Sequence, residues 1–215
     1  ELVSNSSNKL LTASVQNLLQ AKAAEQAVRV QKTFGESLTV ITALADQIKD
    51  MRVMAAKRSL DAGALREELN QSLKTAFERN PRVLGIWLAY EPNGLDGKDS
   101  EFVNDVTRRS NEVGRFASYW SRAAGASLNT IMVEEDLTKT TLSVSGTPYN
   151  SWYTCPRDNK RTCLLDPYAD TVNGKEMLMT TISLPLLVDG KSIGVVGLDI
   201  ALGIGGLPKG RIVEI

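Results

Sequence analysis

The residue with the clearest chemical implication is Asp199, which lies inside the apolar run of residues 193–202. Burying a carboxylate in so apolar a strand is costly unless a cation or several hydrogen-bond donors meet it. This run contains no Lys or Arg, so the partner is either distant in the sequence or a ligand. We take a ligand as the hypothesis, and a structural ion pair with Arg115 or Arg122 as the alternative.

Aromatic side chains gather in the part of the chain that is expected to form the sheet, where ten of the twelve lie between Trp87 and Tyr168. For Trp87, Phe102 and Phe116 the simpler interpretation is a place in the core. Five others stand in polar, turn-rich surroundings, where a ring with a polar tip often lines a cleft. These five are Trp120, Tyr149, Trp152, Tyr153 and Tyr168.

A second acid, Asp170, lies two residues after Tyr168 and three before the turn dipeptide Asn173-Gly174. By itself it is interpreted as a solvated turn residue. Together with Asp199 and the rings, however, it supplies what an amine site needs. Ring faces attract a cation, and carboxylates accept its N–H bonds.

The composition excludes several other classes of function. The 25 Lys and Arg residues are balanced by 25 Asp and Glu, with no basic block, so nucleic acid is not an expected partner. The absence of histidine excludes Ser-His-Asp, Cys-His and His-ligated metal chemistry. No glycine-rich phosphate loop follows a strand. We therefore expect no cofactor, no metal and no enzyme, although a Ser-Lys pair or a carboxylate dyad is a formal alternative.

The two cysteines, Cys155 and Cys163, bracket a polar segment with turn-forming residues. Their spacing predicts a disulfide that staples a hairpin and contributes roughly 2 to 3 kcal/mol. Such a bond indicates an oxidising compartment, such as the periplasm. The alternative is a pair of free thiols in a cytosolic protein.

Residues 10–56 contain no proline and a single glycine, Gly35, and their apolar residues recur at helical spacing. We predict one long amphipathic helix that reaches on the order of 70 Å. Part of it would then protrude or pair with a second copy, so a homodimer through this helix is expected. The alternative is two shorter helices broken near Gly35.

The rest of the chain predicts an α+β fold, an antiparallel sheet with helices on one side. Asp61 is an expected N-cap for a helix over residues 62–79, which Pro81 ends. Asn173-Gly174 and Asp189-Gly190 are tight-turn dipeptides that favour hairpins. A helical turn is expected over 148–155, and five or so strands at 83–90, 115–120, 129–134, near Tyr168, 176–187 and 192–202.

Several runs resemble the membrane-distal module of double Cache sensor domains, the periplasmic ligand-binding regions of bacterial chemoreceptors (methyl-accepting chemotaxis proteins) and some sensor kinases. The matching runs are Ser151-Trp152-Tyr153, Asp166-Pro167-Tyr168-Ala169-Asp170, Gly174-Lys175, Thr181-Ile182-Ser183, Gly190 and residues 194–200. The resemblance implies a PAS-like (Cache) sheet flanked by helices and a periplasmic location. It also implies membrane spans outside this chain.

The same resemblance divides the chain into three expected parts. Residues 1–60 would form a signalling and dimerisation helix, and residues 61–202 the ligand-binding module. Residues 203–215 would be a linker and the start of a truncated or missing membrane-proximal module.

The resemblance also assigns roles within the site. In amino-acid-binding members a Tyr and an Arg hold the ligand's carboxylate, while a later Tyr, an Asp and a strand Asp hold its ammonium group. The ammonium half matches Tyr168, Asp170 and Asp199, and Trp152 and Tyr153 match the Trp-Tyr pair. The carboxylate half departs from the pattern. Asn150 stands in place of the Arg and Ser145 in place of the Tyr.

Without a guanidinium group, nothing offsets the desolvation of an α-carboxylate, so such ligands should be rejected. The departure points to cations that lack a carboxylate: polyamines such as putrescine, biogenic amines such as histamine, or quaternary amines such as choline. Two carboxylates favour a diamine or a primary amine, whereas a quaternary ammonium would need mainly rings. Residues 115–122 also resemble the amine branch, which adds Tyr119 and Trp120 to the expected site.

The expected function is therefore ligand sensing without catalysis. An amine would bridge Asp170 and Asp199 under Trp152, Tyr153 and Tyr168, and would shift the long helix if it binds one helix position better than another. The alternatives are a choline-type or amino-acid sensor of a chemoreceptor or sensor kinase, and a structural or protein-binding ectodomain without a small ligand.

Overall fold

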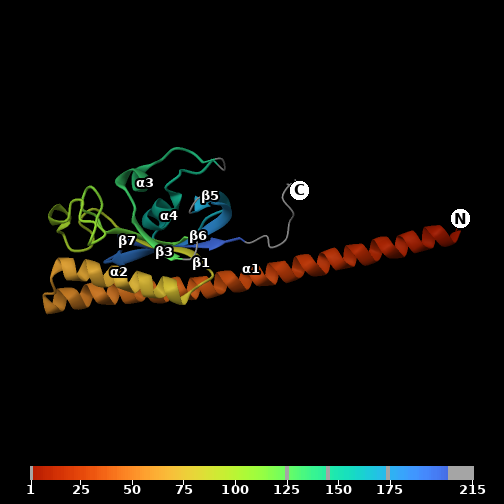
Figure 1. The fold of residues 1–215 in the computed structure, drawn as a ribbon, viewed down its shortest axis with the longest axis horizontal. Coiled ribbons are helices and arrows are strands. Elements are labelled where there is room, and N and C mark those ends of the chain that lie inside the picture. The colour runs from red at the N-terminus through yellow and green to blue at the C-terminus, as the bar shows by residue number, and fades with distance from the viewer. Residues whose placement is uncertain (1, 124–125, 144–145, 173–174, 203–215) are drawn as a thin grey trace. The chain divides into compact units, whose positions relative to one another are not determined.

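A computed structural model describes residues 2–123, 126–143, 146–172 and 175–202 (Figure 1). The side chains of residues 2–12, 123, 169–172 and 175 also lie outside the description, as does the expected linker at 203–215. The helices are α1 (Leu2–Arg58), α2 (Ala62–Arg79), the 3-10 turn η1 (Asp99–Glu101), α3 (Glu134–Thr138) and α4 (Ser151–Asn159). The strands are β1 (Val83–Tyr90), β2 (Ala117–Ala123), β3 (Ala126–Ile131), β4 (Cys163–Leu164), β5 (Tyr168–Val172), β6 (Lys175–Val188) and β7 (Lys191–Ala201).

The predicted long helix is present as α1, which runs through Gly35 without a break. By its contacts the chain divides into two compact units, residues 1–36 and 37–215. In the first unit, apolar side chains such as Val15 and Leu18 are exposed. In the second unit, Ile41 and Ile48 of α1 are fully buried. Among the described residues no helix combines the length and apolarity that crossing a membrane requires.

Helix α2 forms where the sequence predicts it. The Asp61 side chain accepts a hydrogen bond of 3.0 Å from the backbone N–H of Ala64, which caps the helix start. Residues at spacing four, Leu65, Leu69, Leu73 and Phe77, are buried along one face. The amphipathic pattern therefore identifies the face of α2 that is buried in the core.

The strands form one antiparallel sheet in the order β3-β2-β1-β7-β6-β4, with β5 also paired to β6. Strand β1 lies between β2 and β7, as its apolar sequence predicts. At the β6–β7 hairpin Asp189 (φ 49°) and Gly190 (φ 73°) both take the left-handed conformation that the Asp-Gly dipeptide favours. The α+β class is confirmed, and of the seven strands among the described residues only the two-residue β4 was not expected.

Helices cover both faces of the sheet, which corrects the expectation of helices on one side (Figure 1). Asn70 of α2 accepts hydrogen bonds from Ser118 (2.7 Å) and Trp120 (3.0 Å) of β2. Trp152 of α4 instead packs edge-on against Trp87 of β1. Trp87 pairs in register with Tyr119, the neighbour of Trp120. Successive strand residues face opposite sides, so α2 and α4 lie on opposite faces.

A fully buried arginine ties the long loop after β1 to α2. The guanidinium of Arg66 bonds the carboxylates of Asp96 (3.0 Å) and Asp99 (3.1 Å), the hydroxyl of Ser110 (2.8 Å) and the carbonyl of Gly114 (2.9 Å). A buried charge is tolerated when its hydrogen-bonding capacity is met in this way. The loop is thereby held to the core although its only helical element among the described residues is the short η1.

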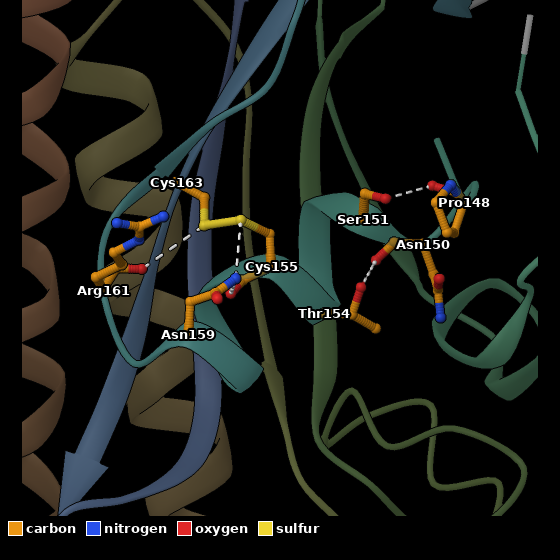
Figure 2. The surroundings of a disulfide bond; sticks show 8 residues. All are labelled: Pro148, Asn150, Ser151, Thr154, Cys155, Asn159, Arg161 and Cys163. Carbon is orange, nitrogen blue, oxygen red and sulfur yellow. Dashed lines mark hydrogen bonds between the residues drawn. A yellow bond between two sulfur atoms is a disulfide. The ribbon is translucent and has the colours of Figure 1, made fainter. Parts of the chain in front are cut away.

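The predicted disulfide is present between Cys155 and Cys163, whose Cα atoms are 6.2 Å apart (Figure 2). Contrary to the expectation from the sequence, the bond does not join the two strands of a hairpin. Cys155 lies within α4 and Cys163 begins β4, and between them Lys160 ends the helix in the left-handed conformation (φ 54°). The bond therefore ties α4 to an edge strand of the sheet.

Candidate ligand-binding cavity

A cavity of about 470 Å³ lies on the α4 face of the sheet, within the usual size range of small-molecule sites. Its floor is made by strand residues and its walls by α3, α4, Ser143, residues 147–149 and the residues around β4. The lining includes Trp87, Tyr119, Asp136, Tyr149, Trp152, Cys155, Asp166, Tyr168, Met179, Thr181 and Asp199.

Asp199 is 5% exposed and stands on the cavity floor, with Thr181 of β6 as its register partner. The Thr181 hydroxyl donates a hydrogen bond of 2.7 Å to Asp199 Oδ1. The Tyr168 hydroxyl lies 2.7 Å from the same Thr181 oxygen. A threonine hydroxyl has one proton to give, so Tyr168 must be the donor in that second bond. The three side chains form a directed chain from β5 through β6 to β7.

Gly85 on β1 makes room for two of the cavity residues. It pairs in register with Asp199. A Cβ atom at this position would lie 2.5 Å from the Tyr119 ring and 2.9 Å from Asp199 Oδ2. Only a glycine therefore allows the phenol ring and the carboxylate to approach each other over β1. This role was not expected from the sequence, where the available signal was a glycine inside an apolar central strand.

Trp152 forms one wall of the cavity from the first turn of α4. Its ring meets that of Trp87 edge-on, with centroids 4.9 Å apart and an interplanar angle of 82°, a favoured arrangement for aromatic pairs. Cys155, one turn further along the helix, also lines the cavity. The disulfide and the tryptophan pair thus both fix α4, which forms this wall, to the sheet.

Two expected ligand contacts do not line the cavity. Trp120 faces α2 and donates its indole N–H to Asn70. Tyr153 is buried beneath the cavity wall, where it accepts a hydrogen bond of 2.6 Å from Arg115 and donates one to Glu91. Burial raises the pKa of the Tyr153 hydroxyl. Both side chains therefore lie in the packing around the cavity and not in its lining.

Other residues of the expected site have different outcomes. The Asp170 side chain and the whole of Ser145 lie outside the described residues. The Asp170 backbone pairs with Met177, two positions from the Tyr168–Met179 pair. Asn150 is buried and donates to the Leu137 carbonyl (2.9 Å), so it joins α4 to α3 and does not line the cavity.

The arginines considered as structural partners of Asp199 make their contacts elsewhere. Arg115 forms an ion pair with Glu134 at 2.7 Å and donates to the Tyr90 carbonyl. Arg122 stacks over the Phe77 ring of α2 at 4.2 Å and donates to backbone carbonyls at the end of that helix. Arg122 is two residues after Trp120 and shares its face of the sheet, the face opposite the cavity.

The charged side chains of the lining are three carboxylates, those of Asp136, Asp166 and Asp199, and no Lys or Arg is among the described lining residues. Asp136 was missed by the sequence analysis because only the fold brings α3 over the sheet. Burial raises the pKa of Asp136, and Glu135 and Glu112 add to this rise while Lys139 opposes it. The cavity is therefore negatively charged and ringed by aromatic groups.

A long helix, an antiparallel sheet helix-covered on both faces and a cavity over the sheet together define a ligand-binding sensor domain of the Cache type. Residues 69–204 match the family described as "Methyl-accepting chemotaxis protein-like, first PDC sensor domain". The chain belongs to this family, and it is a periplasmic ligand-binding domain of a chemoreceptor.

Individual relatives agree with this assignment. Methyl-accepting chemotaxis protein TlpQ of Pseudomonas aeruginosa is 44% identical over 202 residues, which make up 94% of this chain and 28% of that protein. The chain thus spans little more than a quarter of this relative. A short match of 28 residues, 79% identical to 8% of RecA from Campylobacter hominis, covers too little of either protein to carry a functional argument.

Two solved structures share the fold. The structure titled "Methyl-accepting Chemotaxis protein X" has a TM-score of 0.62 and 25% identity, and the match covers 87% of this chain and 64% of that one. The periplasmic sensory domain of the Campylobacter jejuni chemoreceptor Tlp1 has a TM-score of 0.56 and 15% identity, with coverage of 82% and 57%.

Proposed function

We propose that this domain binds a small cationic amine in the cavity and that the parent chemoreceptor signals its presence across the membrane. The observation that carries the proposal is the charge of the lining, which has three carboxylates and no Lys or Arg among the described residues. A cation gains from carboxylates and ring faces. An α-carboxylate would meet like charges and no guanidinium group.

Within this proposal Asp199 is the principal acceptor for the ammonium group. One of its oxygens is engaged by Thr181, which fixes the carboxylate's orientation over the sheet. Tyr168 and Tyr119 border the same floor, and Trp152 supplies a ring at the wall. Asp170 is kept as a proposed second acceptor from the family resemblance, since its side chain lies outside the described residues.

The same proposal assigns a separate role to each of three segments of the chain. Residues 61–202 would hold the ligand, residues 1–60 would transmit its presence, and 203–215 would lead toward a second module. Exposed apolar side chains in the first part of α1, among them Val15, Leu18 and Leu19, are proposed to pair with a second copy. The parent protein would be anchored by membrane spans outside this chain.

The proposal is tested by calorimetric titration with amines and the amino acids that carry the same cation plus a carboxylate. We expect putrescine or histamine to bind, and ornithine and histidine to bind much more weakly or not at all. Choline tests whether ring faces alone suffice. Preferential binding of the amino acids would overturn the amine assignment, and binding of none of them would favour a protein-binding ectodomain.

A further inference from the structure

A lysine ammonium lies against a ring at the rim of the cavity. Lys139 Nζ lies 4.8 Å from the centre of the Tyr149 ring, a cation–π distance. Tyr149 lines the cavity and is 43% exposed, so it stands at the border between cavity and solvent. The segments are held together by backbone bonds from Tyr149 N to Thr141 O (2.9 Å) and from Asn150 N to Lys139 O (3.1 Å).

An acidic group lies at the same rim. Asp136 precedes Lys139 by three residues, is half-buried in α3 and lines the cavity. Lys139 is the C-cap residue of α3, so its side chain is tethered to the end of the helix that carries Asp136. Burial raises the pKa of Asp136, and the Lys139 charge opposes that rise. The cavity border thus combines a carboxylate with a ring face, and the Lys139 ammonium lies over the ring.

We propose that Asp136 and Tyr149 form a second cation-binding site at the rim, whose ring face the ammonium group of Lys139 covers until a dicationic ligand displaces it. The inference rests on the proposed amine function and extends it, because it assigns the ligand two cationic ends. One end binds at Asp199 on the floor of the cavity, and the other replaces Lys139 at the rim.

In the exchange one ammonium group replaces another over the Tyr149 ring, and the incoming group also gains the Asp136 carboxylate. Lys139 is exposed, so its side chain can return to water when it leaves the ring. A monoamine uses only the floor of the cavity and leaves Lys139 in place. A diamine gains the rim contacts but must compete with a cation that is always present, so Lys139 reduces the affinity that a second charge adds.

The test compares putrescine with butylamine, which has the same four-carbon chain and one charge, by calorimetric titration of the whole domain. In the unmodified protein we expect putrescine to bind more tightly. Asp136→Asn should lower putrescine affinity about tenfold, and Tyr149→Leu severalfold, as for the loss of one ion pair or cation–π contact. Lys139→Gln should raise putrescine affinity severalfold. Butylamine affinity should change little in all three variants.

The matched control is Lys191→Gln, which removes a positive charge from the exposed β6–β7 hairpin, away from the cavity lining, and should leave the putrescine-to-butylamine ratio unchanged. Melting temperatures check that each variant is folded. If butylamine binds but the ratio is the same in the Asp136, Tyr149 and Lys139 variants as in the unmodified protein, the rim site is overturned while the amine function stands. If neither amine binds the unmodified protein, the proposed function is overturned, and the rim site with it.

Discussion

Thr181 and Asp199 are register partners on β6 and β7, and a hydrogen bond of 2.7 Å runs from the threonine hydroxyl to the carboxylate. Because Tyr168 donates to the same hydroxyl oxygen, three strands contribute one residue each to a single chain of bonds. Such a chain fixes the orientation of the acid before any ligand arrives. Preorganisation of this kind lowers the ordering cost of binding.

Replacing Asp199 by Asn should reduce amine affinity on the order of 100-fold, because truncating one partner of a buried charge pair has effects of that size. The melting temperature of the unliganded protein should stay the same or rise, because a buried charge is removed. Asp189→Asn in the exposed hairpin turn is the matched control and should leave binding unchanged. Strong destabilisation of the unliganded Asp199 variant would mean that the carboxylate belongs to an internal ion pair.

Thr181→Val keeps the side-chain shape but removes the hydroxyl between Tyr168 and Asp199. We expect a weaker amine affinity and a loss of about 1 to 3 kcal/mol in the free energy of unfolding. Tyr168→Phe should weaken binding too, and the double variant should be less affected than the sum, since both changes break one chain. Thr180→Val, which removes a bond to the Leu165 carbonyl, serves as control. Strict additivity in calorimetry would argue against the chain.

Gly85→Ala should weaken amine binding, because the added methyl group would collide with the Tyr119 ring and with Asp199 Oδ2. The melting temperature should also fall. Gly35→Ala is the control, since no atom lies within 4 Å of its Cβ position and alanine favours a helix by about 0.5 to 1 kcal/mol. Titration and thermal melts of both variants check this expectation, and unchanged binding in Gly85→Ala would show that the two side chains can move apart freely.

Replacing Cys155 and Cys163 together by Ser should lower the free energy of unfolding by roughly 2 to 3 kcal/mol, the chain-entropy value for so short a loop. Amine affinity should fall as well, because α4 carries Trp152 and loses its tie to β4. Urea denaturation of the oxidised, reduced and doubly substituted protein measures the first effect. Equal midpoints for the oxidised and reduced forms would contradict it.

The two tryptophans of the predicted site should behave differently. Trp152→Leu removes a ring from the cavity wall and should weaken amine binding several-fold. Trp120→Phe removes the hydrogen bond to Asn70, which is worth about 1 kcal/mol of stability, and should leave affinity unchanged. A titration in which Trp120→Phe is the more damaging change would restore the original assignment.

Local signals in the sequence were sufficient for most elements of the fold. An N-cap, a four-residue apolar spacing and Pro81 predicted α2 with its observed bounds, and a continuous apolar run predicted β1. Asp189-Gly190 predicted its hairpin because few other dipeptides tolerate two left-handed residues. These features depend on interactions between residues close in sequence.

The make-up of the cavity was predicted only in part. Asp199, Tyr168, Trp152 and Tyr119 were expected in the site and line the cavity. Asp136, Thr181 and Gly85 were not expected there, because their proximity depends on strand register and on the path of α3.

Tyr119 and Trp120 show the limit most clearly. They are neighbours in one strand and therefore face opposite sides of the sheet. The alternation along a strand was therefore enough to separate them, although both were expected in the site. Only the tertiary structure decided which of them meets the cavity, because the packing of α2 on one face and α4 on the other assigns each side of the sheet its role.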